Sequence, residues 1–232
     1  MTIVFRGRPD GLGNRLEEVI KLSALQMRCE GLTFRYLWTL SLRRDRNYWP
    51  RFSSPIRVVP LPLPTFPSKL SRISCQPVAP RELHAAASQV VLDRSAKALD
   101  LAIHIRAGDR ISPTSSHPHF MSPSLHYQIL TRALEIAACD QQLVGVVSDD
   151  TELAATFCKR LCERGVDADV VAPGDAWGAL ATLQAAREVV MASSFSSFAL
   201  LGSLLGSKKV HVPKECRSLD VERYGLEPTG IF

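Results

Sequence analysis

The sequence lacks the features that would tie it to a membrane or to secretion. Its most apolar run, residues 189–206, is interrupted by five serines and is short for a membrane span. Polar and charged residues follow Met1 within a few positions, so we expect no signal-peptide core. There is also no internal repeat and no low-complexity tract. We therefore expect a globular protein without an integral membrane segment, located in the cytoplasm.

Cysteines are few and show no pattern. The chain has six, and without a secretory signal we interpret them as reduced thiols. Cys158 and Cys162 stand one helical turn apart, but no other Cys or His lies at ligand spacing, so two free thiols are favoured over a metal site. The triplet at residues 167–169, Asp-Ala-Asp, imitates a metal-binding motif but is expected before its strand, away from a ligand crevice. We expect no metal.

Basic residues outnumber acidic ones without forming a block. The formal net charge is +5 and the pI is near 9.0, which suits an anionic ligand. The basic residues are spread over both halves of the chain and form no tail of like charge. The composition therefore does not require nucleic acid as a partner, and we expect none.

The second half of the chain alternates regularly between strand-like and helix-like segments. Apolar strand-like runs occur at residues 99–105, 143–147, 168–172, 189–192 and 210–212. Helical patterns occur between them at residues 124–138, 151–164, 176–187 and 195–205. This alternation predicts an α/β fold with a parallel, doubly wound sheet.

The first half begins in the same way and then becomes irregular. A strand at residues 3–6 and a helix at 13–30 are followed by a strand at 32–38. The helix is expected to bury Leu16, Val19, Ile20, Ala24 and Met27, with Glu17, Glu18, Lys21 and Arg28 on the opposite face.

Residues 41–80 read as a long irregular segment. Only residues 56–59 look like a strand, and the prolines of residues 60–67 exclude a helix. The segment is either an acceptor-facing region or a plain surface excursion. After a helix near residues 81–91, we place a boundary between a first lobe, residues 1–95, and a second lobe, residues 96–232.

Polar clusters follow four of the predicted strands. They are GLGN at residues 11–14, HIRAGDR at 104–110, Ser-Asp-Asp at 148–150 and the serines from 193 to 196. Ligands of parallel α/β sheets bind beyond the carboxyl ends of the strands, where the strand order reverses. The clusters are therefore the candidate binding site.

The GLGN loop has two readings. Gly11 and Gly13 can adopt positive φ and turn backbone N–H groups toward an anion at the start of the helix. Alternatively, the loop is only a tight turn capped by Asn14. Asp10 and Glu17 flank it and are candidate general bases, although Glu17 can equally be a solvated acid of the first helical turn.

Arg106 stands at the end of a buried strand, where an unpaired charge is costly. It therefore needs either a structural partner, for which Asp109 is the obvious candidate, or a diphosphate ligand. Asp109 can also brace the loop, with Gly108 making the turn. His104 by itself fits a buried core histidine.

The remaining clusters contain helix caps and further groups that can contact a ligand. One of Asp149 and Asp150 is expected to cap the next helix, which leaves one carboxylate for a ribose or a purine. The serines before Phe195 are N-caps by default, but hydroxyls at a helix N-terminus also suit a phosphate.

Taken in order, GLGNRL, HIRAGD, SDD and SSFSSFALLGSLLG resemble the motifs of the α-1,2-fucosyltransferase family and its fucosyltransferase relatives. The runs FMSPSLHYQILTRALEIA and DAWGALATLQAAREVVMASSFS are also similar to that family. The resemblance covers the first thirty residues and most of residues 99–213. It implies a GT-B-like fold of two Rossmann-like lobes with parallel sheets, the first lobe reduced.

The resemblance also implies a function. A sugar, typically fucose, would be transferred from a GDP-sugar to a glycan, glycolipid or small-molecule acceptor, with inversion and without a metal or other cofactor. Arg106 would stabilise the leaving diphosphate. The positions implied for nucleotide-sugar binding are Gly11, Gly13, Asn14, Arg15, His104, Arg106, Asp149, Ser194, Phe195 and Ser196.

Two features depart from the family pattern and leave alternatives open. Ala107 replaces the second of two adjacent arginines, although Arg110 can supply some charge, and the GLGN and HIRAGD motifs are close together for an acceptor lobe. A catalytically inactive nucleotide-sugar-binding or scaffold protein is the main alternative. An RNA-binding module, suggested by arginines and aromatics at residues 43–57, is a third.

Overall fold

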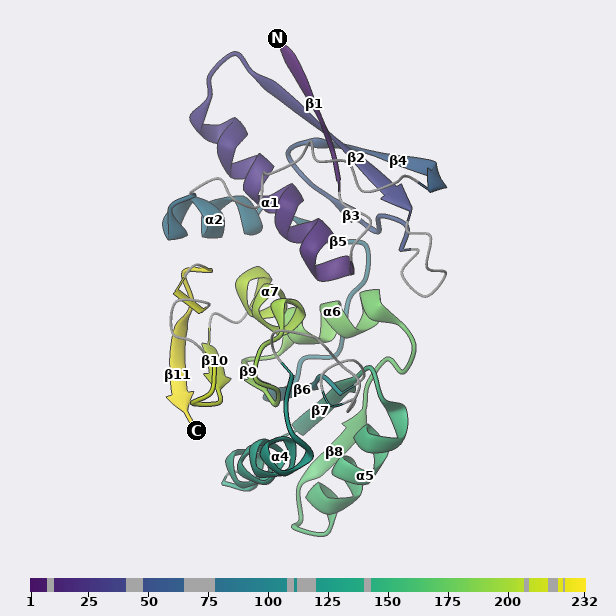
Figure 1. Ribbon diagram of the computed structural model, residues 1–232, viewed down its shortest axis with the longest axis vertical. Coiled ribbons are helices and arrows are strands. Elements are labelled where there is room, and N and C mark those ends of the chain that lie inside the picture. The colour runs from purple at the N-terminus through teal and green to yellow at the C-terminus, as the bar shows by residue number, and fades with distance from the viewer. Residues whose placement is uncertain are drawn as a thin grey trace. The chain divides into compact units, whose positions relative to one another are not determined.

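The chain divides into two compact units, Met1–Asp93 and Arg94–Phe232. The computed structural model (Figure 1) describes residues 1–7, 11–40, 48–64, 78–107, 111, 120–139, 143–206, 209–216, 221–222 and 224–232. Each unit is described by itself.

The N-terminal unit is built on a small parallel sheet with the strand order β1-β2-β4. Its strands are β1 (Thr2–Arg6), β2 (Thr33–Leu40) and β4 (Arg57–Pro64). Helix α1 (Leu12–Arg28) connects β1 to β2, and α2 (Pro80–Ala87) packs against α1. A separate antiparallel pair is formed by β3 (Phe52–Ser53) and β5 (Val91–Leu92).

Strand β4 is longer than the sequence predicts. It continues through the proline-rich run to Pro64, pairing with β2 as far as Leu40. β4 lies at the edge of the sheet, where prolines are tolerated, and its pairing with β2 has a register shift between Thr39 and Leu40. The prolines exclude a helix, as expected, but they do not end the strand.

The predicted polar face of α1 is wrong except at Arg28, which is exposed as expected. Leu16, Val19, Ile20 and Ala24 are buried as expected, but Glu17, Glu18 and Lys21 are buried too, and Met27 is half exposed. The charges are accommodated because they have partners. Lys21 Nζ lies 2.7 Å from Glu17 Oε1, and the Tyr36 hydroxyl donates to Glu18 Oε2 at 2.6 Å.

The C-terminal unit is a six-stranded parallel sheet with the order β11-β10-β9-β6-β7-β8. Its strands are β6 (Leu101–Ile105), β7 (Leu143–Ser148), β8 (Asp167–Val170), β9 (Glu188–Met191), β10 (Lys209–Val212) and β11 (Glu227–Ile231). Its helices are α4 (Pro123–Ala138), α5 (Thr151–Cys162), α6 (Ala176–Ala185) and α7 (Ser197–Leu205).

This order makes the sheet doubly wound. The chain runs outward through β6, β7 and β8, then returns to the other side of β6 and continues through β9, β10 and β11. Helices α4 and α5 cover one face, and α6 and α7 cover the other (Figure 1). The strand order therefore reverses between β6 and β9, which is where such folds bind ligands.

One core cluster of this unit is packed on the face covered by α4 and α5. Leu101, Ile103 and Ile105 of β6 point into it, together with Ile129 of α4 and Phe157 of α5. Because side chains alternate along a strand, Ala102 and His104 lie on the opposite face, toward α6 and α7. The position of His104 follows from this alternation.

Every strand and helix predicted from residue 99 onward is present, with boundaries shifted by a few residues. Strand β11 was not predicted, because its sequence EPTGI contains a proline and a glycine. The structure explains both. β11 is an edge strand with an irregular register, and a Cβ at Gly230 would come 2.8 Å from His211 Nδ1. Within the described parts of the chain, no helix is long and apolar enough to cross a membrane.

Candidate functional site

Three of the predicted clusters meet at the carboxyl edge of the six-stranded sheet. Arg106 follows β6, Asp149 follows β7, and the segment Ser193–Ser196, here called the serine loop, follows β9. Since β6 is hydrogen-bonded to both β7 and β9, the three strand ends are neighbours in space. They surround the point where the strand order reverses.

Asp149 holds the end of β6 in place. Its Oδ1 accepts the backbone N–H of Ala107 at 2.8 Å, and its Oδ2 lies 3.3 Å from Nη1 of Arg106. The side chains of Arg106 and Asp149 are each about one-third exposed. A guanidinium fixed in this way at a partly open strand end is suited to an anion.

The burial of Ala107 accounts for the absence of a second arginine after Arg106. The residue is completely buried, and its N–H is already taken by Asp149. An arginine side chain at this position would have to displace packed atoms. Position 107 therefore does not present its side chain at the open edge.

The other residues after β7 have structural roles. Asp150 is the N-cap of α5, accepting the N–H of Leu153 at 3.0 Å, and its own N–H donates to Ser148 Oγ at 3.0 Å. The expected cap is thus Asp150. Asp149 is the surplus carboxylate. It already binds Ala107 and Arg106, so only part of its hydrogen-bonding capacity is left for a ligand.

His104 is a buried, neutral imidazole. Its residue is only 5% exposed, and its ring lies 5.6 Å from that of Phe198 in α7. Burial, and then the charge of Arg106, lower the pKa of His104 to about 3. Its Nδ1 has no hydrogen-bond partner among the described residues. His104 therefore supplies no positive charge at neutral pH.

The serine loop contains polar groups with weak partners. The N–H of Ser194 donates to Met121 Sδ at 3.2 Å, and the N–H of Ser196 donates to Met191 Sδ at 3.2 Å. The hydroxyl of Ser196 caps α7 by accepting from Ala199 N at 3.3 Å, as expected for an N-cap. Ser193 is fully buried, and within the described structure its hydroxyl has no hydrogen-bond partner.

The backbone of the GLGN loop differs from both predictions made for it, whereas the binding of an anion there stays a prediction. Helix α1 begins at Leu12, so Gly13 and Asn14 lie inside its first turn and Asn14 is not the cap. The N-cap is Gly11, whose φ is −58°, and neither glycine is among the described residues with positive φ. A Cβ at Gly11 would meet no atom within 4 Å, so the fold of this unit gives no steric reason for a glycine there.

Arg15 and Glu17 are held inside the N-terminal unit. Arg15 is completely buried, donates to the carbonyl of Thr39 at 2.8 Å, and lies 5.5 Å from the ring centre of Trp38. The Thr39 hydroxyl in turn donates to the carbonyl of Gly7 at 3.0 Å. Glu17 pairs with Lys21. The contacts of Arg15 and Thr39 stabilise the end of β2 and connect it to Gly7, directly after β1.

Several predictions fall outside the described residues. They concern Asp10, Gly108, Asp109 and Arg110, together with residues 41–47 and 65–77 of the expected acceptor-facing segment. Within the described parts, no group of three or more His, Cys, Asp or Glu side chains gathers closely enough to hold a metal ion. The Asp-Ala-Asp triplet forms the start of β8 itself, at the opposite end from the carboxyl edge.

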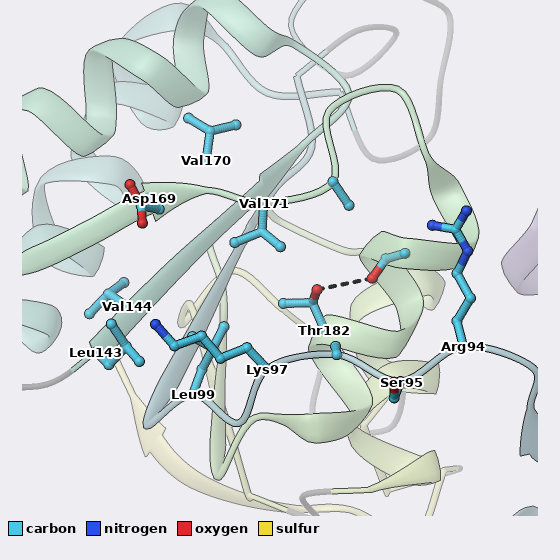
Figure 2. A pocket seen from close by; sticks show the side chains of 13 residues that line it. Arg94, Ser95, Lys97, Leu99, Leu143, Val144, Asp169, Val170, Val171 and Thr182 are labelled. Atoms are coloured by element: carbon cyan, nitrogen blue, oxygen red, sulfur yellow. Dashed lines mark hydrogen bonds between the residues drawn. The ribbon is translucent and has the colours of Figure 1, made fainter.

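A pocket of about 410 Å³ lies elsewhere in the C-terminal unit. Figure 2 shows it between Lys97 and Leu99 on one side, Thr182 of α6 on another, and Asp169 and Val171 of the β8 region. The dashed line marks the Thr182 hydroxyl, which donates to the carbonyl of Gly178 at 2.9 Å. None of the predicted site residues lines this pocket, so it is separate from the carboxyl edge.

The fold is that of fucosyltransferases. The crystal structure of NodZ α-1,6-fucosyltransferase soaked with GDP-fucose matches 88% of this chain and 92% of its own, with a TM-score of 0.53 and 14% identity. The crystal structure of POFUT1 in complex with GDP-fucose matches 99% of this chain and 97% of its own, with a TM-score of 0.50 and 12% identity. No protein-family model matches the sequence, and no curated protein matches it.

These neighbours support the predicted GT-B-like architecture of two Rossmann-like lobes. The N-terminal lobe is the reduced one, with a three-stranded parallel sheet against the six strands of the other. At such low identity the likeness concerns the fold alone.

Sequence reasoning missed the residues that support the site. Met121 stands two residues before α4 and has no local motif, and Met191 reads only as a core residue of β9. Ser193 was included in the serine cluster but not singled out. Only the three-dimensional packing reveals that the two methionines contact the serine loop and that Ser193 is buried within it.

Proposed function

We propose that this chain is a glycosyltransferase that moves a sugar, most simply fucose, from a GDP-sugar to a hydroxyl of a glycan, glycolipid or small-molecule acceptor. The observation that carries the proposal is the placement of Arg106, Asp149 and the serine loop around one strand reversal. The fold is shared with one fucosyltransferase soaked with GDP-fucose and another in complex with GDP-fucose, which supports a GDP-sugar as donor.

In this proposal Arg106 is the main catalytic group. Breaking the sugar–phosphate bond places negative charge on the departing diphosphate, and a cation aimed at it lowers the barrier. Arg106 is partly exposed at the strand end, and Asp149 restricts its orientation without covering it. Its guanidinium would take the place of a divalent ion, so we propose a metal-independent reaction.

The remaining groups of the carboxyl edge would bind the nucleotide. Asp149 retains lone pairs that can accept from hydroxyl or amino groups of a nucleoside. The serine loop leads into the N-terminus of α7, where N–H groups and the helix dipole favour a phosphate. His104 stays neutral beneath them, so it would contribute a hydrogen bond rather than charge.

For the acceptor we propose Asp10 as the general base. The other candidate, Glu17, already forms a buried ion pair with Lys21 at 2.7 Å, and proton uptake there would break that pair. A single displacement with one base gives inversion at the anomeric carbon. The linkage suggested by the sequence motifs is α-1,2, whereas one structural neighbour is named an α-1,6-fucosyltransferase.

The test is a donor-turnover assay on the full chain. GDP-fucose is incubated with a panel of acceptor glycans in the presence of EDTA, and GDP release and the linked product are measured. Arg106→Ala should reduce turnover by about 100-fold or more, because it removes the cation at the leaving group. Arg94→Ala is the matched control, since Arg94 also pairs with a carboxylate, that of Asp175, away from the carboxyl edge.

A second candidate function has its own support. The buried Ala107 in place of an arginine and the small N-terminal sheet both favour a protein that binds a nucleotide sugar without transferring it. Such a protein would bind GDP-fucose at the same carboxyl edge of the sheet and would release no GDP. Binding without turnover over the whole acceptor panel would favour this scaffold function over catalysis.

A further inference from the structure

The serine loop is held by sulfur atoms on both sides of the sheet. Met121 belongs to the core packed under α4 and α5. Met191 stands opposite His104 in the pairing of β9 with β6, so its side chain lies on the face of α6 and α7. Both methionines are completely buried, and each accepts one backbone N–H of the loop at 3.2 Å.

A thioether is a weak acceptor for a backbone N–H group. Buried N–H groups are normally paired with carbonyl, carboxylate or water oxygens, which bind the hydrogen more strongly. The contacts of the Ser194 and Ser196 amides with sulfur are thus weak ones. Ser193 Oγ and His104 Nδ1, next to them, are buried and have no partner in the described part of the chain.

The weak contacts lie where the proposed donor phosphates would arrive. A phosphate oxygen carries negative charge and binds N–H groups roughly twice as strongly as a neutral acceptor does. Exchange of an N–H from sulfur to phosphate is therefore favourable, whereas an N–H held by a carbonyl would be given up less readily. Ser196 is buried, but Ser194 is only half-buried, so its amide is the one within reach of a ligand.

Resting on the proposed function, we propose that Met121 is a positioning residue whose sulfur is a temporary acceptor. It holds the Ser194 N–H in the free protein and yields it to a phosphate oxygen of the nucleotide. Met191 keeps the Ser196 N–H and so retains the start of α7. The sulfur at position 121 sets how readily the serine loop changes from its free to its bound form.

This role predicts opposite effects for two substitutions of similar size. Met121→Leu removes the acceptor only from the free form, so GDP should bind about threefold more tightly. Met121→Gln offers an amide oxygen that holds the N–H more firmly, so GDP should bind about tenfold more weakly. A residue that only fills space would give weaker binding, or no change, in both variants.

The test is calorimetric titration of the full-length protein with GDP. Met27→Leu and Met27→Gln are the matched controls, because Met27 is a half-exposed methionine of α1 that contacts Gln89 through its sulfur. Urea unfolding of each variant shows whether it is folded. If Met121→Gln does not fold, the amide proton of Ser194 in ¹⁵N-labelled wild type and Met121→Leu decides, since GDP should move it downfield in both.

The inference is supported if Met121→Leu binds GDP most tightly, the wild type less tightly, and Met121→Gln most weakly. Equal affinities, weaker binding in both variants, or an unmoved Ser194 amide in a wild type that does bind GDP would overturn it while leaving the proposed function intact. A wild type that binds no GDP at all would overturn the proposed function itself.

Discussion

The buried polar groups at the carboxyl edge of the C-terminal unit differ from those of the N-terminal unit in their hydrogen bonding. In the N-terminal unit, Arg15 is bound by a carbonyl and an aromatic ring, and Glu18 by the Tyr36 hydroxyl. At the carboxyl edge of the C-terminal unit, His104 Nδ1 and Ser193 Oγ lack partners among the described residues. Two backbone amides of the serine loop donate there to methionine sulfur atoms. Satisfied groups stabilise a fold, whereas unsatisfied ones at a strand reversal indicate a binding site.

The largest expected change in the free energy of unfolding comes from removing a satisfied polar group of the N-terminal unit. Arg15→Met should lower the free energy of unfolding by about 3 kcal/mol, because the Thr39 carbonyl loses its donor and the Trp38 ring its cation. Urea denaturation followed by circular dichroism measures this change. GDP affinity of the folded variant should stay at the wild-type value, and a selective loss of affinity would instead assign Arg15 to the ligand.

A second variant tests the same network with a smaller change. Tyr36→Phe removes the hydroxyl that donates to Glu18 at 2.6 Å and leaves a buried carboxylate short of one donor. The expected loss of stability is about 2 kcal/mol. An unchanged denaturation midpoint would show that Glu18 is satisfied without Tyr36.

The lowered pKa of His104 predicts that the stability of the protein depends on pH. Its pKa is about 3 in the folded protein against about 6.5 when unfolded, so between these values only the unfolded chain binds the proton. Stability is therefore complete above pH 6.5 and falls as the pH drops below it, by about 1.4 kcal/mol per pH unit. Comparing the wild type with His104→Gln over pH 4.5–7.5 isolates this contribution, and parallel curves would refute it.

The smallest expected effect on stability concerns Ser193. Because its buried hydroxyl has no partner in the described structure, Ser193→Ala should leave stability unchanged or raise it by up to about 1 kcal/mol. The matched control is Ser203→Ala, whose equally buried hydroxyl donates to the Ala199 carbonyl at 3.2 Å. Equal destabilisation of both variants would show that Ser193 does have a structural partner.

The sequence was informative where a local pattern determines the structure. Alternating apolar segments predict the doubly wound sheet, and the order of the polar clusters places Arg106, Asp149 and the serine loop at strand ends. The Asp150 and Ser196 caps follow from their positions before helices.

Contacts between distant segments could not be read from the sequence. The pairing of Asp149 with Ala107 depends on the register of β6 and β7, and the burial of Arg15 and Glu18 depends on side chains of β2. Strand β11 could not be predicted either, because its pairing with β10 overrides the unfavourable proline and glycine.

The measurement that tests the central claim most directly is thermal stabilisation by GDP, ADP, UDP and CDP with EDTA present. A nucleotide at about 100 times its dissociation constant should stabilise the protein by about 2.7 kcal/mol. We predict stabilisation by GDP alone, lost in Arg106→Ala and retained in Arg94→Ala. Stabilisation by none of the nucleotides, or full GDP stabilisation of Arg106→Ala, would contradict the assignment of the carboxyl edge as a GDP-sugar site.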